Sequence, residues 1–194
     1  MLMRGQSLLE LLIAMTVIIV GLTAAGTLIF SNIRLQEQSS QRVVAANLAR
    51  EGIEIAKAVR DSNWLKNVDF RDGMYDTGND YTGVPDWVQG QVTGFDFSPD
   101  DIDDAGTAII VSNHASSVRL MVQEASGHPV RSTTFYRRLL TFEPICSDGS
   151  IRSEGTNCGG LIPVQGVRVT SRVVWDARGT RRESVIVDEL YDWR

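Results

Sequence analysis

Histidine, cysteine and proline are scarce in this chain of 194 residues. It contains two histidines, two cysteines and five prolines, and the first proline is Pro85. Because a zinc site usually needs four Cys or His ligands at close spacing, we expect no metal site of this kind and no cofactor. The scarcity of histidine also leaves little for acid–base catalysis.

Residue patterns typical of enzymes are also missing. The sequence contains neither a G-x-x-x-x-G-K-[ST] phosphate loop nor a G-x-S-x-G motif. Ser116 and Ser117 follow His114, His128 lies in a Gly-His-Pro turn, and Asp100–Asp104 has no predicted framework to fix its geometry. We therefore predict that the chain is not an enzyme and has no catalytic residues; an anchored extracellular hydrolase is the alternative.

The negative charge of the chain is concentrated in one segment. The net charge is −5, and residues 67–106 contain one arginine and ten aspartates. A broad nucleic-acid-binding surface is therefore not expected. Arg178, Arg181 and Arg182 surround a predicted turn, where they could contact DNA phosphates or a neighbouring subunit's acidic loop; a solvated turn is the simpler interpretation.

The N-terminal part contains a long hydrophobic run. Leu11–Phe30 is twenty residues without a charge, which is long enough to cross a bilayer as a helix. No proline interrupts the next residues, and Val44, Leu48, Ile55 and Val59 recur on one helical face. We predict one helix over residues 6–60, about 80 Å long at 1.5 Å per residue, with a transmembrane half (6–32) and an amphipathic half (33–64).

Three interpretations of this N-terminus compete. It could be a cleaved secretory signal, since Thr23-Ala24-Ala25 offers small residues at a cleavage position. It could also be a plain single-pass anchor, with Arg4 favouring a cytoplasmic N-terminus. The third interpretation depends on Glu10, because a carboxylate at the edge of an apolar span needs either access to the interface or a positive partner.

The segment that contains Glu10 resembles the type IV prepilin family. Residues 4–12 (RGQSLLELL) precede the apolar helix in the order that the family shows. The segments NLAREGIE (47–54) and RDSNW (60–64) resemble minor pilins and minor pseudopilins. The resemblance implies a type IV pilin-like fold, a long N-terminal helix packed on a C-terminal antiparallel sheet.

The resemblance also implies a processing and assembly pathway. Residues 1–5 would be a leader peptide, a prepilin peptidase would cut after Gly5, and Gln6 would become the methylated N-terminus. Glu10 would pair with the N-terminal amine of a neighbouring subunit. The implied function is that of a minor pilin or pseudopilin, a structural subunit of a type IV pilus or type II secretion-like filament. The alternative is a single-pass membrane-anchored extracellular binding domain that does not polymerise.

The partners and location follow from the same resemblance. They are the prepilin peptidase, other pilin or pseudopilin subunits, the pilus assembly platform, and membrane lipid before assembly; nucleic acid is not expected. The chain would cross the inner membrane once, with a cytoplasmic N-terminus and an extracytoplasmic head, and would then move to a pilus at the cell surface.

The C-terminal part changes character twice. Residues 65–106 are rich in Gly and Asp and are predicted to be a loop, attached to a core by Trp87, Phe95 and Phe97. Residues 107–194 contain β-branched and alternating segments, which predict an antiparallel β-sheet head of about four to five strands. Packing this sheet on the second half of the helix would bury both apolar faces, so the predicted fold class is α+β.

Two smaller features of this part remain open. Asp69, Asp72, Asp76 and Asp80 suggest a calcium loop, but their spacing does not fit an EF-hand, and a solvated surface loop is preferred. Cys146 and Cys158 are separated by eleven residues. They could form a disulfide in an oxidising exterior or remain two free thiols.

Overall fold

The computed structural model describes residues 8–75, 81–88, 91–114, 118–123, 133–153, 158–159 and 162–192. These residues form one long helix, α1 (Leu8–Lys66), followed by seven strands and one turn of 3-10 helix (Ala105–Thr107). The chain divides into two compact units, residues 1–42 and residues 43–194. The first contains the apolar part of α1, and the second contains the rest of α1 and the sheet.

Helix α1 ends in a backbone motif that the sequence supplies locally. Asn67 has a positive φ of 57°, a left-handed conformation that Asn tolerates better than most residues. Its N–H donates to the carbonyl of Trp64 and the N–H of Val68 donates to the carbonyl of Asn63, both at 3.1 Å. This is a Schellman arrangement, which satisfies carbonyl groups at the end of a helix.

The sheet is antiparallel and is built around β5. On one side β5 pairs with β6, and on the other side it pairs with β3 through its first half and with β1 further along. β2 pairs with β1, β4 pairs with β3, and β7 pairs with β6. The strands are β1 (Thr82–Val88), β2 (Gln91–Asp96), β3 (Ala108–His114), β4 (Val118–Val122), β5 (Thr133–Cys146), β6 (Val164–Ala177) and β7 (Thr180–Tyr191).

A tight turn joins β6 to β7. Arg178 and Gly179 lie between the paired residues Ala177 and Thr180, and both have positive φ values, 53° and 78°. Two consecutive positive φ values are typical of a type I′ turn, whose twist matches that of the strands it joins. The turn predicted at Arg178 is therefore confirmed, and it joins two antiparallel strands.

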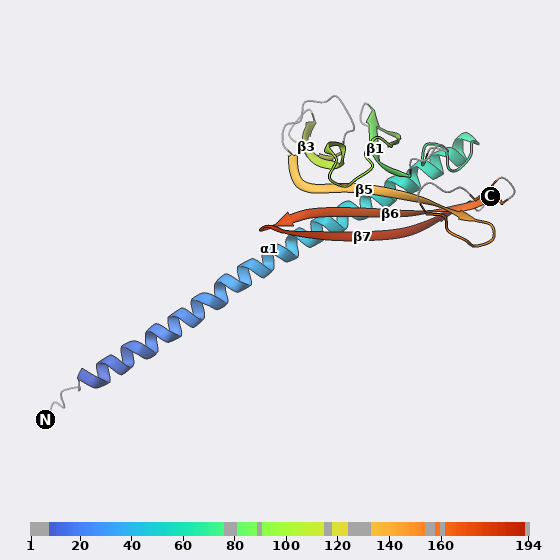
Figure 1. The fold of residues 1–194 in the computed structure, drawn as a ribbon. Coiled ribbons are helices and arrows are strands. Elements are labelled where there is room, and N and C mark those ends of the chain that lie inside the picture. The colour runs from blue at the N-terminus through green and yellow to red at the C-terminus, as the bar shows by residue number, and fades with distance from the viewer. Residues whose placement is uncertain are drawn as a thin grey trace. The chain divides into compact units, whose positions relative to one another are not determined.

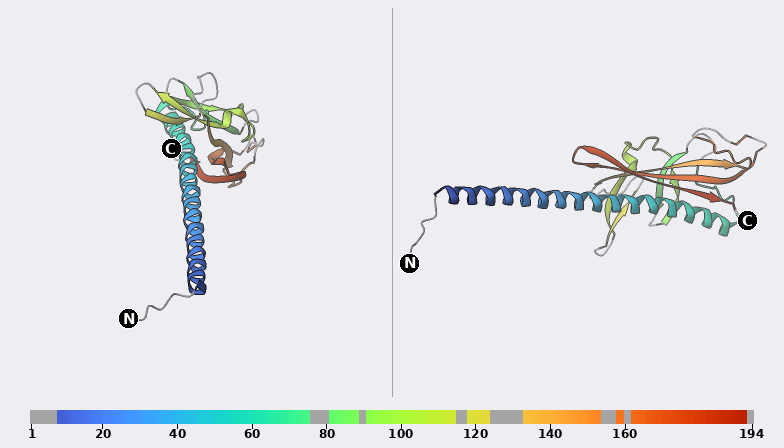
Figure 2. Two further views of the ribbon diagram at one scale, coloured as in Figure 1. Left: turned by 90° about the vertical axis from the view of Figure 1, so that its left-hand side faces the viewer. Right: turned by 90° about the horizontal axis from the view of Figure 1, so that it is seen from below.

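One face of the sheet packs on residues 43–66 of α1 (Figures 1 and 2). Fully burying a large apolar side chain stabilises a fold by about 1.5–3 kcal/mol, so this layer of side chains is the main source of stability in the second unit. The larger cluster contains Ile53, Ile55, Ala56, Val59, Trp64, Phe70, Met74, Phe95, Leu140, Phe142, Val167, Val169 and Leu190. The smaller one contains Ala45, Leu48, Ala49, Ile109, Tyr136, Val173, Trp175 and Ala177.

The opposite face of the sheet is covered in part by the loop that follows β2. Leu139 and Val174, which alternate with helix-facing neighbours, are buried there together with Val84 and Ile102. The Arg137 guanidinium donates to the backbone carbonyls of Asp103 and Asp104. These contacts attach the acidic loop to the sheet. The predicted α+β class, with the long helix on an antiparallel sheet, is confirmed.

The interpretation of residues 65–106 as a loop was wrong in part. This region contains the hairpin β1–β2, and Val84 and Phe95 from its two strands are buried. The Phe95 ring packs on Phe142 of β5, with centroids 4.7 Å apart, as expected for an anchoring aromatic residue. Local propensity hid these strands, because Gly, Pro and Asp within them disfavour a sheet until tertiary contacts supply the stabilisation.

The helix and the sheet are in close contact at Gly52. A Cβ atom added there would lie 2.6 Å from Oγ of Ser171 and 3.4 Å from Cδ of Arg138. Gly52 therefore has a packing role that outweighs its poor helix propensity, which is about 1 kcal/mol below that of Ala.

Arg138 lies at this contact and is 1% exposed. Its Nη1 donates to the carbonyl of Leu48 at 2.9 Å and lies 3.3 Å from Oε2 of Glu51, and its Nε donates to Oε1 of Gln123 at 2.9 Å. Burial lowers the pKa of the guanidinium, and the nearby Glu51 carboxylate opposes that shift. This buried arginine links α1 to β5 and to the residue that follows β4.

Gln123 extends the polar network on its other side. The amide nitrogen of this fully buried residue donates to the carbonyls of Thr107 and Arg138, at 2.7 and 2.6 Å. Buried polar groups are stable when they are hydrogen-bonded, so the network fixes how β3, β4 and β5 meet near the helix.

The Gly52→Ala substitution should lower the free energy of unfolding, although Ala favours helices. We expect a loss of about 1–3 kcal/mol, the usual cost of overpacking. Adding Ser171→Ala removes the atom nearest to the new Cβ and should restore much of that loss. Thermal unfolding of the detergent-solubilised chain, followed by near-UV circular dichroism, measures the effect. Gly21→Ala, with nothing within 4 Å of its new Cβ, is the control.

The Glu51→Gln substitution should destabilise the same unit, because it removes the carboxylate that faces the buried Arg138. Weakening the partner of a buried charged group typically costs about 1–3 kcal/mol. Glu54→Gln, one turn along an exposed face, should change the unfolding free energy by less than about 0.5 kcal/mol. Equal effects of the two substitutions in denaturant titrations would contradict the role of Glu51.

Candidate functional site: the N-terminal apolar helix

The first part of α1 exposes an unbroken apolar surface. Its most hydrophobic 18-residue window has a mean hydropathy of 2.4, and none of that window is buried. A surface of this size far exceeds the apolar patches of ordinary soluble domains. It contains Leu8, Leu9, Leu11, Leu12, Ile13, Met15, Val17, Ile18, Ile19, Val20, Leu22, Leu28, Ile29, Phe30, Ile33 and Leu35, each at least half exposed.

The threonine and serine hydroxyl groups within this surface are hydrogen-bonded inside the helix. The hydroxyl groups of Thr16, Thr23 and Thr27 donate to the carbonyls three residues earlier, at 2.8–2.9 Å. Ser31 does the same at 2.8 Å. Because a lipid environment offers no hydrogen-bonding partners, such internal bonds are what a membrane-spanning helix requires. The segment is therefore long and apolar enough to cross a membrane once.

Glu10 lies in the first turn of α1 and is exposed. Among the described residues it has no ion-pair partner. The next charged residue along the helix is Arg34, about 36 Å further on at 1.5 Å per residue. The first turn is favourable for a carboxylate, because the helix dipole is positive there. Within the described part of the chain, the Glu10 carboxylate is thus a negative charge without a neighbouring positive charge.

The predicted processing site is not part of the described structure. Gly5 and Gln6, the residues on the two sides of the expected cut, both lie outside the described residues. The description of α1 begins at Leu8, two residues after Gln6.

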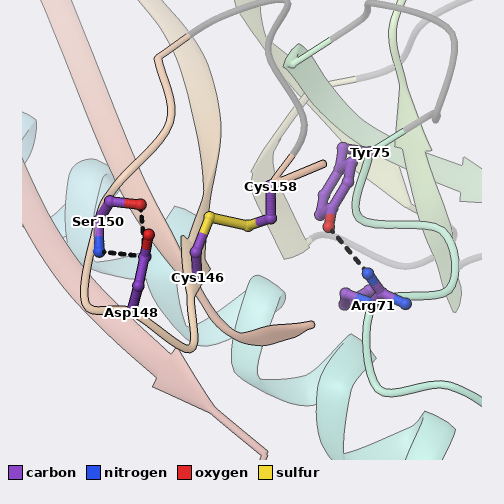
Figure 3. Close-up of a disulfide and its surroundings, with 6 residues drawn as sticks. All are labelled: Arg71, Tyr75, Cys146, Asp148, Ser150 and Cys158. Atoms are coloured by element: carbon purple, nitrogen blue, oxygen red, sulfur yellow. Dashed lines mark hydrogen bonds between the residues drawn. A yellow bond between two sulfur atoms is a disulfide. The ribbon is translucent and has the colours of Figure 1, made fainter. Parts of the chain in front are cut away.

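Cys146 and Cys158 are joined by a disulfide in the structure (Figure 3). Their Cα atoms are 5.6 Å apart, and both residues are buried. The bond connects the end of β5 to the segment that leads into β6. Hydrogen bonds from the Oγ and backbone N–H of Ser150 hold the pKa of the Asp148 carboxyl below its ordinary value and fix the turn inside this loop.

Of the aspartates considered for calcium, Asp69 has another role in the structure, and Asp72 is exposed. The Asp69 carboxylate accepts hydrogen bonds from the guanidinium and the backbone N–H of Arg71, and these hold its pKa below the ordinary value. Asp76 and Asp80 lie outside the described residues. Within the described ranges, no group of three or more Cys, His, Asp or Glu side chains could hold a metal ion.

An open groove of about 620 Å³ lies beside the acidic loop. Its lining includes Phe95, Phe97 and the carboxylates of Asp86, Asp96 and Asp104. Asp96 accepts hydrogen bonds from the N–H and hydroxyl of Ser98, and Asp104 accepts from two backbone N–H groups of its own loop. These two carboxylates thus stabilise turns.

Arg181, one of the three arginines near the hairpin turn, forms an ion pair within the chain. Nη1 of Arg181 lies 2.8 Å from Oδ2 of Asp103, in the acidic loop of the same chain. The other residues considered for catalysis cannot be placed, since Ser116, Ser117 and His128 lie outside the described residues and the side chain of His114 is not described.

Sequence analysis did not single out Arg138, Gln123 or Glu51, the polar residues at the centre of the second unit. One signal was available, however. In β5 the adjacent Arg137 and Arg138 must point to opposite faces, so one of them has to face the helix.

A scan against protein-family models and searches of the curated proteins and the solved structures found no match to this chain.

Proposed function

We propose that this chain is a structural subunit of a filament of the type IV pilus or type II secretion kind, with the role of a minor pilin or pseudopilin. One observation carries the proposal: a fully exposed apolar helix begins with a carboxylate that has no countercharge among the described residues. The order of Gly5, Glu10 and the apolar segment in the sequence supports it. The α+β fold of the second unit is compatible with it.

The proposed mechanism exchanges one apolar environment for another. Before assembly, lipid solvates the side chains of residues 8–35. After assembly, the same side chains contact the helices of other subunits. Small residues such as Ala14, Gly21, Ala24, Ala25 and Gly26 allow helices to approach closely. Because the polar side chains of residues 11–30 are already bonded inside the helix, neither environment leaves them unsatisfied.

Glu10 sets the axial position of neighbouring subunits in this proposal. Cleavage after Gly5 creates a positive amine on Gln6, four residues before the carboxylate. A neighbour displaced along the filament axis can bring its amine to Glu10. An unpaired charge in an apolar environment costs a few kcal/mol, so other staggers are disfavoured.

The proposed location follows from this mechanism. The chain crosses the inner membrane once with its N-terminus in the cytoplasm, places its head outside, and moves into a filament with the help of an assembly platform. The disulfide between Cys146 and Cys158 suits an oxidising compartment outside the cytoplasm.

The cleavage step can be tested by intact mass. Co-expression with a prepilin peptidase should remove residues 1–5, and Gly5→Val should block the cut because the peptidase requires a residue without a side chain there. Gly26→Ala, in the same helix but away from the cut, should be processed normally. An unprocessed wild-type chain beside a peptidase that cuts a known prepilin would contradict the proposal and favour a plain single-pass anchor.

The assembly step can be tested separately with Glu10→Gln. This substitution should leave cleavage intact and reduce incorporation into filaments by at least about tenfold, because the loss of one charge pair in an apolar site exceeds 1.4 kcal/mol. Glu37→Gln, in the polar part of the helix, is the matched control. The measurement is immunoblotting of sheared filaments against membrane fractions. Normal incorporation of the Glu10 variant would exclude the charge-pair role while leaving the cleavage result untouched.

A further inference from the structure

The long outer edge of the sheet is formed by β7 (Figure 1). All twelve residues from Thr180 to Tyr191 pair with β6, without a bulge or register shift. Within the described residues, the other side of β7 pairs with no strand. Every second residue of an antiparallel edge strand turns its N–H and C=O away from the sheet, so β7 offers a regular set of unpaired backbone groups.

The other two edges of the described sheet are less suitable. β4 has five residues, and β2 has six and pairs with β1 across an irregularity. Short strands and bulges protect an edge from further pairing. β7 has neither protection, and it contains no proline.

β7 has positive charges near its start and negative charges near its end. Arg181 and Arg182 stand near the start, Asp188 and Glu189 stand near the end, and SVIV occupies positions 184–187 between them. An antiparallel copy of the same strand presents these groups in reverse. From this arrangement we propose that β7 pairs with β7 of a second copy of the chain, around a two-fold axis at Val185.

Backbone geometry restricts the possible registers. In an antiparallel pair, opposite residues must both turn their backbone groups toward the partner or both turn them away. Two copies of one strand can therefore pair only around a residue, and not around the midpoint between two residues. The registers that overlap most are centred on residues 185 and 186, with eleven residues each, and the next are centred on residues 184 and 187, with nine each.

Charge then selects one of these four registers. Centring on Val185 places Arg181 opposite Glu189 of the second copy and Arg182 opposite Asp188, so four pairs of opposite charges face each other by symmetry. Three of these groups also have partners in their own chain, since Arg181 pairs with Asp103, Asp188 with Lys57 and Glu189 with Arg168. Centring on Ile186 would place Glu183 opposite Glu189, a repulsive pair that occurs twice. Centring on Ser184 or on Val187 would place no opposite charges across from each other within β7.

Side-chain exposure supports pairing at this edge, and Arg182 supports the register centred on Val185. Val185 and Val187 are 47% and 52% exposed on the face away from the helix, and pairing would cover them. On the helix-facing side, Nε of Arg182 is buried and has no hydrogen-bond partner among the described residues. The Asp188 carboxylate of a second copy would face that guanidinium.

The axis also fixes the direction of the partner. Ala45, Leu48 and Ala49 pack near the Ala177 end of the hairpin, and Ile53–Val59 pack near its Leu190 end. Residues 43–66 of α1 therefore run in the same direction as β7. A two-fold axis perpendicular to the sheet reverses this direction in the second copy. Residues 43–66 of the two copies therefore run in opposite directions in the pair. This inference does not depend on the proposed function.

Cysteine cross-linking of the full chain in detergent tests the pairing. In the proposed register position 185 faces itself, and opposite Cα atoms in such a pair are about 5.5 Å apart, within the range of a disulfide. Position 187 and its symmetry mate are about 13 Å apart along the strand, at 3.3 Å per residue. Mild oxidation should therefore convert Val185→Cys to a covalent dimer and leave Val187→Cys, the equally exposed control, monomeric.

A charge reversal in the Val185→Cys background tests the register independently. Arg182→Glu should reduce the dimer yield, because it places two negative charges opposite each other, and adding Asp188→Arg should restore it. Peptide mass mapping verifies that the native Cys146–Cys158 bond is retained. Equal cross-linking at positions 185 and 187, no cross-linking at 185, or a yield that ignores the charge reversal would each overturn the proposal.

Discussion

The close contact between Gly52 of the helix and Ser171 and Arg138 of the sheet determines how the second unit is built. The two apolar clusters lie on either side of it, with Ala49 on the N-terminal side and Ile53 on the C-terminal side. A side chain at position 52 would hold the helix away from the sheet, and both clusters would lose contacts that fall off steeply with distance. The Arg138 network lies at the same contact. A buried guanidinium needs acceptors, and the helix supplies the Leu48 carbonyl and the Glu51 carboxylate. Close packing and polar satisfaction thus depend on one glycine.

The elements predicted correctly are those whose signal is local. The helix follows from periodic apolar residues without proline, and the β6–β7 hairpin follows from alternating valines on both sides of a short turn. The β1–β2 hairpin was missed because its sequence is typical of turns, and its stability comes from Val84, Phe95 and their distant partners. Arg138 was missed for a related reason. Periodicity requires one arginine of the pair in β5 to face the helix, but only the tertiary structure identifies its acceptors.

The candidate site shows a different limit of sequence reasoning. The apolar surface and the position of Glu10 could both be predicted, since they depend on composition and on helical geometry. A partner for Glu10 could not be identified, because the described chain provides no cation near that turn. The same helix therefore has two parts with different requirements. Residues 43–66 bury apolar side chains against the chain's own sheet, whereas residues 8–35 leave theirs exposed.

Like the first part of α1, the edge of the sheet formed by β7 exposes groups that have no partner within the described chain. A regular twelve-residue edge would be an aggregation hazard if its side chains accepted any partner. The charges of β7 limit that hazard. Centring the pair on Ile186 instead of Val185 would place Glu183 opposite Glu189, and these two carboxylates repel each other. Specificity here comes from the difference between registers rather than from the strength of one contact. A strand with unpaired backbone groups and opposite charges at its two ends is complementary to an antiparallel copy of itself, and β7 has both properties.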